Sequence, residues 1–339
     1  MNNDSKTQGF PRALGDIVSV VVAPVRLRRK ALPFAAAFAV VSVAAACSAG
    51  ASPQTAPSTP ENPTPSQVAA TTPTPSAAAT TASPEPSSTA VQKANANYKK
   101  FDPKNFGDAL GGQNSWYPLV PGTQTLRDGS INRGSRKLKH QLRVTVTDVV
   151  KEVDGVQTVA VLDQDIDAGQ VGEASLDYLA QDKSGNVWYL GSYTEIYEGG
   201  QFVNAVDAWL AGKKGAKPGV WMMADPKEGM KYVQMHNSRE TIHSEVAKVG
   251  EKKCVDYDCF KSLVILEDGT EFKYFGPGVG HIATEPNYSG GEQEKEELVN
   301  VVKLTRKGLA EFSAEALKLD KHARKESTVF ANSDAAKRA

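Results

Sequence analysis

The chain has 339 residues, of which 39 are Lys or Arg and 39 are Asp or Glu, so its formal net charge is zero. Without residues 1–46, whose removal is predicted below, 33 basic side chains would face 37 acidic ones. Neither form has the basic excess that binding to nucleic acid requires, so we expect no nucleic-acid partner.

The first 46 residues have the order of an export signal. A basic cluster within residues 26–30 precedes an apolar segment over residues 31–46, which is shorter than the roughly 20 residues of a membrane span. The run Val43–Cys47, VAAAC, resembles the lipobox of bacterial lipoproteins. We therefore predict that residues 1–46 are a cleaved signal peptide. An uncleaved signal anchor and a twin-arginine signal at Arg28 and Arg29 are the alternatives.

Cys47 is the residue that such a signal would expose for lipidation. Each buried methylene of an acyl chain contributes about 0.8 kcal/mol to membrane binding. One chain binds only marginally, whereas two or three chains, palmitate among them, hold a protein firmly. We therefore expect a lipid-anchored protein on the extracytoplasmic face of the cell membrane.

Residues 47–92 follow as a segment of Ser, Thr, Pro, Ala and Gln with few charges and no aromatic residue. Such a composition cannot bury enough apolar surface to offset the entropy of ordering the chain. Recurrent proline keeps a segment of this kind semi-extended. We predict a disordered tether between the lipidated Cys47 and the domain that follows.

Residues 93–326 are predicted to form one β-rich extracytoplasmic domain, because apolar and polar residues alternate in short segments separated by turn residues. Asp154-Gly155 and Asp268-Gly269 indicate tight hairpins of type I′. The predicted strands are 142–146, 156–162, 176–181, 187–190, 232–235, 240–249, 261–266, 271–275 and 298–304. The expected fold class is mainly β (α+β), a curved antiparallel sheet or partly open barrel with a C-terminal amphipathic helix.

The helix is predicted from Leu309 to Ala323, where apolar residues recur at intervals of three and four. Thr305 is suited to cap it. We expect its apolar stripe to pack against the sheet of its own domain. Residues 327–339 are expected to form a flexible tail.

Three motifs carry a family resemblance: Asn114–Gly122 (NSWYPLVPG), Ala180–Tyr189 (AQDKSGNVWY) and Tyr274–Gly280 (YFGPGVG). In order and spacing they resemble an uncharacterised β-rich domain of secreted bacterial proteins, over roughly residues 100–325. The helix near the C-terminus is similar to that of actinobacterial members. The resemblance implies a sheet-rich fold outside the cytoplasm and supplies no reaction and no catalytic residue.

Aromatic residues offer two interpretations. Trp116 and Tyr117 stand beside a Pro-Gly turn and suit a wedge that plugs one end of the sheet. Trp188 and Tyr189 are expected to pack in the core or at its rim. Alternatively, all four line a groove for a ligand.

Two groups of residues suggest metals, although neither has a complete signature. Asp163, Asp165 and Asp167 alternate like the ligands of an EF-hand loop, but Ala168 replaces its glycine and its closing glutamate is missing. We therefore interpret this run as a solvated hairpin end. The five histidines show no zinc-site spacing, so no metal and no cofactor are expected.

Cys254 and Cys259 are the cysteines that remain once Cys47 is acylated. Exported proteins fold in an oxidising compartment, so we predict a disulfide between these two residues.

No catalytic signature occurs in the sequence, neither a Gly-x-Ser-x-Gly elbow nor a Ser-x-x-Lys motif with its partners. We therefore expect no enzyme. The first functional hypothesis is a lipid-anchored module that binds an apolar or amphiphilic ligand, such as a lipid or a wall component. The alternative is a structural or protein-interaction module of the cell envelope, with a hydrolase as a more distant third.

Overall fold

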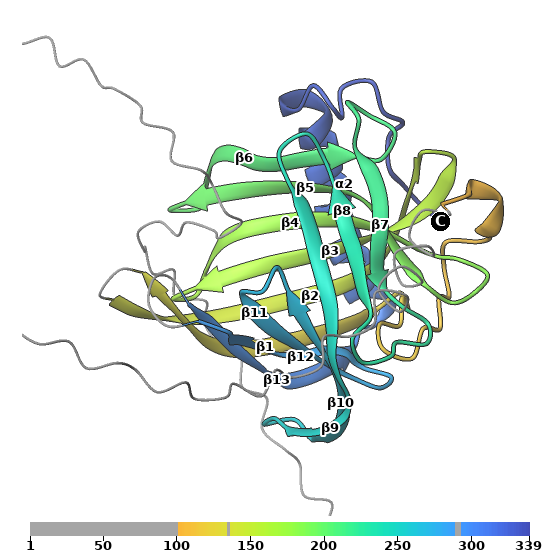
Figure 1. Ribbon diagram of the computed structural model, residues 1–339. Coiled ribbons are helices and arrows are strands. Elements are labelled where there is room, and N and C mark those ends of the chain that lie inside the picture. Colours follow the sequence, from red (N-terminus) through yellow and green to blue (C-terminus); the bar gives the residue numbers. More distant parts are fainter. Residues whose placement is uncertain (1–100, 134–135, 289–292) are drawn as a thin grey trace, which may run out of the picture. The chain divides into compact units, whose positions relative to one another are not determined.

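The computed structural model describes residues 101–133, 136–288 and 293–339 (Figure 1). The predicted signal peptide and tether lie outside these residues. The described elements are η1 (Pro103–Asn105), β1 (Thr123–Arg133), β2 (Arg136–Val153), β3 (Val156–Asp167), β4 (Gln170–Gln181), β5 (Val187–Glu198), β6 (Gln201–Leu210), β7 (Lys217–Met222), β8 (Lys231–His236), β9 (Thr241–Cys254), β10 (Cys259–Glu267), β11 (Glu271–Gly276), β12 (Gly280–Pro286), β13 (Glu294–Lys303), α2 (Arg306–Glu326) and β14 (Lys337–Arg338).

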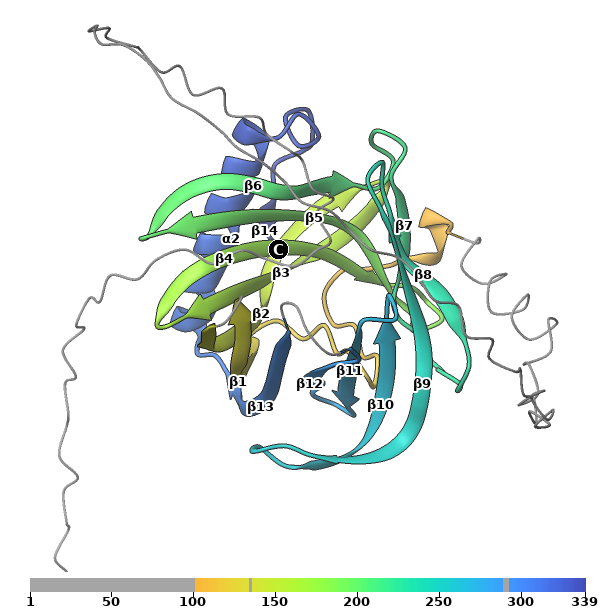
Figure 2. The ribbon, with the colours of Figure 1, turned by 60° about the vertical axis from the view of Figure 1, so that its left-hand side comes forward.

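The strands form one antiparallel sheet that closes on itself. The order is β1-β13-β12-β11-β10-β9-β8-β7-β5-β4-β3-β2, and β1 pairs with both β13 and β2, so twelve strands complete a barrel. β6 pairs with β5, and β14 pairs with β2 at Val149 and Val150, beyond the residues of β2 that pair with β1. Figure 2 shows the ring of strands and the long hairpin of β9 and β10. The predicted mainly β fold is confirmed, and the barrel is closed.

Local sequence explains the hairpins that organise this sheet. Asp154 and Gly155 have φ angles of 50° and 75° and join β2 to β3, and Asp268 and Gly269 have φ angles of 48° and 68° and join β10 to β11. Positive φ at both central residues gives the type I′ turn, whose twist matches that of the flanking strands. Both predicted hairpins are confirmed.

The strands absent from the prediction are β1, β6, β7, β12 and β14. β1 has the sequence TQTLRDGSINR, in which charged and polar residues obscure the alternation. β6 is mostly exposed or half-buried, because it lies along β5 outside the closed ring. Pairing with neighbours, rather than local pattern, makes these segments strands.

Helix α2 packs on the outside of the barrel against β2, β3 and β4. The Thr305 hydroxyl accepts a hydrogen bond from the Gly308 amide at 3.2 Å and caps the helix, as predicted. Ala316 and Ala323 on the apolar stripe are fully buried. The expected packing of the helix on its own sheet is confirmed.

The C-terminal residues correct a prediction, because residues 327–339 pack against the barrel instead of forming a flexible tail. The Phe330 ring is fully buried, with its centroid 6.0 Å from that of Tyr178 and 5.5 Å from that of Tyr193. Lys337 and Arg338 form β14 beside β2. The Phe330 ring, the pairing of β14 with β2 and the ion pair between Arg338 and Asp148 hold this segment in place, and no local periodicity reveals these contacts.

The segment before β1 ties together turns at one end of the barrel. The Asn114 side-chain amide donates to Gly185 O at 2.8 Å and to Met223 O at 3.1 Å, which follow β4 and β7. The Gly278 amide, in the β11–β12 turn, donates to Ser115 O at 2.7 Å. This end is called the plugged end below. The turns β3–β4 and β10–β11 lie at the opposite end, because neighbouring strands are antiparallel.

Candidate functional site

Charged side chains gather inside the barrel at the end opposite the plugged end. Asp163, Asp165 and Asp167 share one face of β3, because successive side chains of a strand point to opposite faces. Asp165 is 9% exposed and Asp167 is 3% exposed. The predicted solvated hairpin end is therefore wrong: the β2–β3 and β3–β4 pairings place these carboxylates within the sheet.

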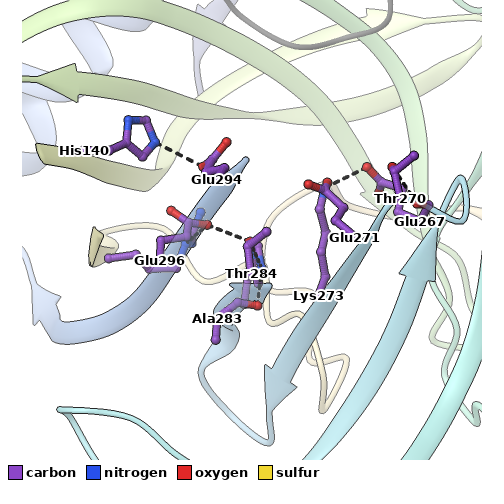
Figure 3. A network of polar contacts seen from close by, with 11 residues as sticks. His140, Glu267, Thr270, Glu271, Lys273, Ala283, Thr284, Glu294 and Glu296 are labelled. Atoms are coloured by element: carbon purple, nitrogen blue, oxygen red, sulfur yellow. Dashed lines mark hydrogen bonds and ion pairs between the residues drawn. The ribbon is translucent and has the colours of Figure 1, made fainter. Parts of the chain in front are cut away.

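His140 and three carboxylates form what we call the histidine cluster: His140, Asp167, Glu294 and Glu296 (Figure 3). The fully buried His140 ring places Nδ1 2.7 Å from Asp167 Oδ1 and Nε2 3.1 Å from Glu294 Oε1. Burial disfavours the charged imidazolium, but the hydrogen bonds to Asp167 and Glu294 outweigh it and raise the pKa of His140 to about 11. The cluster joins β2, β3 and β13.

The Glu296 carboxylate is held by two donors. Arg127 Nε and Thr284 Oγ1 each donate to Glu296 Oε1 at 2.9 Å. Arg127 is 3% exposed and Glu296 1% exposed, so this ion pair is desolvated and depends on close geometry. Glu296 Oε2 is buried without a hydrogen-bond partner among the described residues. The side chain is thus oriented through one oxygen only.

A second group, the lysine cluster, consists of Glu267, Glu271 and Lys273 on β10 and β11. Lys273 Nζ lies 2.8 Å from Glu267 Oε1 and 3.2 Å from Glu271 Oε1. Burial raises the pKa of Glu271 to about 7; Lys273 lowers this pKa and Glu267 raises it. Figure 3 shows this group across from the histidine cluster.

The same crowding affects the carboxylates of β3. Burial raises the pKa of Asp163 to about 7; the Arg127 guanidinium opposes this shift, and the charges of Asp177 and Glu296 add to it. The pKa of Asp165 also lies well above its usual range, because of burial and the neighbouring Asp163 charge. Like charges in a desolvated site disfavour ionisation, so keeping these carboxylates ionised costs free energy.

Three of the other histidines, His236, His243 and His281, do not join the cluster. His236 Nδ1 contacts Thr241 Oγ1 at 2.7 Å, and the His243 side chain is 67% exposed. His281 lies in the interior with Nε2 2.9 Å from Ala283 O, and burial lowers its pKa, with Arg127 and Lys273 adding to the effect.

The four candidate ligand-lining aromatics lie close to the plugged end and pack against other side chains. Tyr189 is fully buried, its OH donates to Asp177 Oδ1 at 2.6 Å, and Trp188 Nε1 donates to Asp182 Oδ2 at 2.8 Å. The Tyr117 and Trp116 side chains are half-buried against the same core. The Tyr117 ring is edge-on to those of Trp221 and Phe275, at centroid distances of 5.7 and 6.4 Å. These contacts correspond to the core and rim packing considered above.

The two cysteines of the domain are bonded, as predicted. Cys254 and Cys259 form a disulfide that joins the ends of β9 and β10 at a Cα–Cα distance of 3.9 Å. The bridge closes a turn of four residues, so its role is to pin this hairpin.

Cys47 lies outside the described residues, so its lipidation stays a prediction. Within the described residues, no helix is both long and apolar enough to cross a membrane.

The histidine cluster is absent from the sequence predictions, although the sequence carries one signal for it. Glu294 and Glu296 share a strand face with the fully buried Leu298, and extending that alternation backwards places both carboxylates on the inner side. Their meeting with His140 has no local signal, because the residues are about 150 positions apart and meet only when β1 pairs with β2 and β13.

Two solved structures are similar to parts of this chain. No protein-family model matches the sequence, and no curated protein matches it. A crystal structure described as an exported protein with a YmcC-like fold from Bacteroides fragilis is 12% identical, covers 56% of this chain and 100% of its own, and has a TM-score of 0.34. A β-barrel-like protein of the domain of unknown function DUF1849 from Brucella abortus is 12% identical, covers 53% of this chain and 96% of its own, and has a TM-score of 0.31. The resemblance based on the three motifs remains a prediction.

Proposed function

We propose that the chain is a lipid-anchored extracytoplasmic binding protein that takes a small cationic ligand into the charged end of its barrel. The observation that carries the ligand class is the crowding of negative charge around Asp163, Asp165 and Glu296. Burial, with the neighbouring carboxylate charges adding to it, raises the pKa of Asp163 to about 7, and a bound cation would relieve the repulsion among these carboxylates.

The location follows from the order of the sequence segments. A basic cluster, an apolar segment and Cys47 are followed by a Pro-rich tether and then by the barrel. Radiolabelled palmitate should label the full-length protein in the membrane fraction of a bacterial host. The Cys47→Ser variant should carry no label; equal labelling of both proteins would refute the anchor.

The side chains inside the barrel restrict the class of ligand that we expected from the sequence, which was an apolar or amphiphilic molecule. An apolar ligand needs an apolar wall, but Tyr189 and Phe275 near the plugged end pack against other aromatic rings. The charged end presents carboxylates, of which Glu271 and Glu294 are each 29% exposed and therefore reach solvent. An amphiphilic ligand suits this wall only if its polar group is cationic.

A structural or protein-interaction module, the alternative hypothesis, predicts a contiguous exposed apolar patch. Among the described residues, the exposed large apolar side chains come from β6, β9 and three loops: Val120, Val203, Val249, Tyr257 and Tyr288. We favour ligand binding, because carboxylates buried inside the barrel are unusual in a core that is filled only for structure.

Native mass spectrometry of the full-length protein from an exporting host tests the ligand. We expect an additional mass that organic extraction at acidic pH removes, because protonated carboxylates release a cation. The Asp163→Asn variant should carry less of it, whereas Asp225→Asn, which removes a carboxylate that is 78% exposed, should carry the wild-type amount. A clean protein mass before extraction, with the variants indistinguishable from the wild type, would overturn the proposal.

A further inference from the structure

Three side chains of the histidine cluster have the arrangement of metal ligands. One ligand atom each from His140, Glu294 and Glu296 lies within 4.8 Å of the other two, and His140 Nε2 is 3.1 Å from Glu294 Oε1. Bonds of about 2.0–2.2 Å to a tetrahedral ion place its ligand atoms roughly 3.4 Å apart. Small side-chain adjustments therefore bring the three atoms to bonding distance of one ion.

A second, independent observation comes from the buried carboxylate. Glu296 is 1% exposed, and its Oε1 receives both the Arg127 and the Thr284 hydrogen bonds. Its Oε2 is buried and has no hydrogen-bond partner among the described residues, and Figure 3 shows the unbonded oxygen on the side of His140. A buried carboxylate oxygen without a hydrogen-bond partner calls for an explanation, and binding of an ion is one.

The orientation of His140 also suits a ligand. Asp167 Oδ1 lies 2.7 Å from Nδ1, so that the carboxylate accepts the Nδ1 proton and directs Nε2 toward Glu294 and Glu296. A carboxylate behind the histidine is the usual partner of metal-bound imidazole, because it fixes the ring and its tautomer. Asp167 would act here as a positioning residue.

We propose that His140, Glu294 and Glu296 bind one divalent first-row transition-metal ion, with Asp167 orienting the imidazole. The inference rests on the proposed function only in placing a cation at the charged end of the barrel. One imidazole nitrogen with carboxylate oxygens suits zinc or manganese, whereas calcium prefers oxygen ligands alone. Three protein ligands leave at least one coordination position for water or a bound molecule.

The competing explanation is a structural ion pair, in which a protonated His140 bridges Asp167 and Glu294 with no metal. Both explanations need the same fold, so stability alone does not separate them. The two explanations are separated by the number of metal ions bound per chain and by whether the ligand variants lose affinity for metal. An ion pair of this kind binds no zinc.

The test uses the full-length protein, stripped with a chelator and titrated with Zn²⁺, Mn²⁺ and Ca²⁺ by calorimetry. Glu294→Gln removes a proposed ligand. Glu285→Gln is the matched control, because the Glu285 side chain is 31% exposed, close to the 29% of Glu294, and pairs with Lys253 outside the cluster. We expect one Zn²⁺ or Mn²⁺ per chain and weaker binding of Ca²⁺. Glu294→Gln and Glu296→Gln should each weaken Zn²⁺ binding by at least about 10-fold and Asp167→Asn by about 10- to 100-fold. Glu285→Gln should leave Zn²⁺ binding unchanged.

Loading with Co²⁺ supplies a spectroscopic control, since its visible absorption depends on the ligands. We expect an absorption band that Glu294→Gln changes and that Glu285→Gln leaves as in the wild type. Absence of stoichiometric metal in a folded wild-type protein, or equal affinity in all variants, would overturn the inference. If the protein binds no metal but keeps an extractable organic ligand, this inference alone is refuted. If it binds metal without an organic ligand, the metal is itself the cation of the proposed function.

Discussion

Replacing Asp320 by Asn should destabilise the protein strongly, because it leaves a buried lysine without its counter-charge. Lys151 Nζ lies 2.9 Å from Asp320 Oδ1, and the two side chains are 0% and 2% exposed. The Tyr178 hydroxyl donates to the same Oδ1 at 3.0 Å. The pair joins α2 to β2 and lies beside Phe330, so it holds the helix and the C-terminal segment on the barrel.

The magnitude follows from the burial of both charges. Removing one partner of a buried ion pair costs about 3–5 kcal/mol, because the remaining charge stays desolvated. Burial lowers the pKa of Lys151, and the Asp320 charge opposes that shift, so the pKa falls further in the variant. The unfolded lysine binds its proton up to about pH 10.4, so stability rises with pH above the lowered folded pKa. The variant should therefore begin to recover stability at a lower pH than the wild type.

Urea unfolding of the full-length protein, followed by circular dichroism between pH 6 and pH 10, measures this effect. Glu311→Gln is the control: it removes the exposed partner of Lys307, and pairs of that kind contribute about 0.3–0.5 kcal/mol. In the double variant Lys151→Met/Asp320→Asn the loss should be smaller than the sum of the single losses. A loss below about 1 kcal/mol for Asp320→Asn, or additive single losses, would refute the reasoning.

Three further predictions concern the barrel and its turns. Replacing Cys254 and Cys259 together by Ser should lower the free energy of unfolding by about 2 kcal/mol, which urea unfolding in the absence of reductant measures. Ala168 has a φ of 48° in the β3–β4 turn, so Ala168→Gly should raise the free energy of unfolding by about 1 kcal/mol, and a lower urea midpoint would contradict this. Burial raises the pKa of Asp163 from 3.8 to about 7, so the folded state binds the proton more tightly and stability falls as pH rises between these values. Asp163→Asn should therefore be more stable than the wild type at pH 8 and not at pH 4; the same difference at both pH values would refute this assignment.

Local patterns predicted much of the fold. Alternation of apolar residues located nine of the strands, Asp-Gly pairs located two hairpins, and the three-and-four spacing before Ala323 located the helix. These signals succeed because a strand face, a type I′ turn and a helix stripe each depend on residues only a few positions apart. The disulfide belongs to the same class, since Cys254 and Cys259 are five positions apart.

The closed ring, the packed C-terminus and the candidate site were decided by tertiary structure. Closure needs β1 to pair with β13, from Thr123 with Lys303 to Ile131 with Glu294, and no local pattern encodes that pairing. The alternation of Asp163, Asp165 and Asp167 predicts a shared face but not that the face is buried, because a charged face is ordinarily solvated. Sequence by itself thus determined the elements and their turns, whereas the charged interior exists because ring closure brings β3 and β13 to the same side of the barrel.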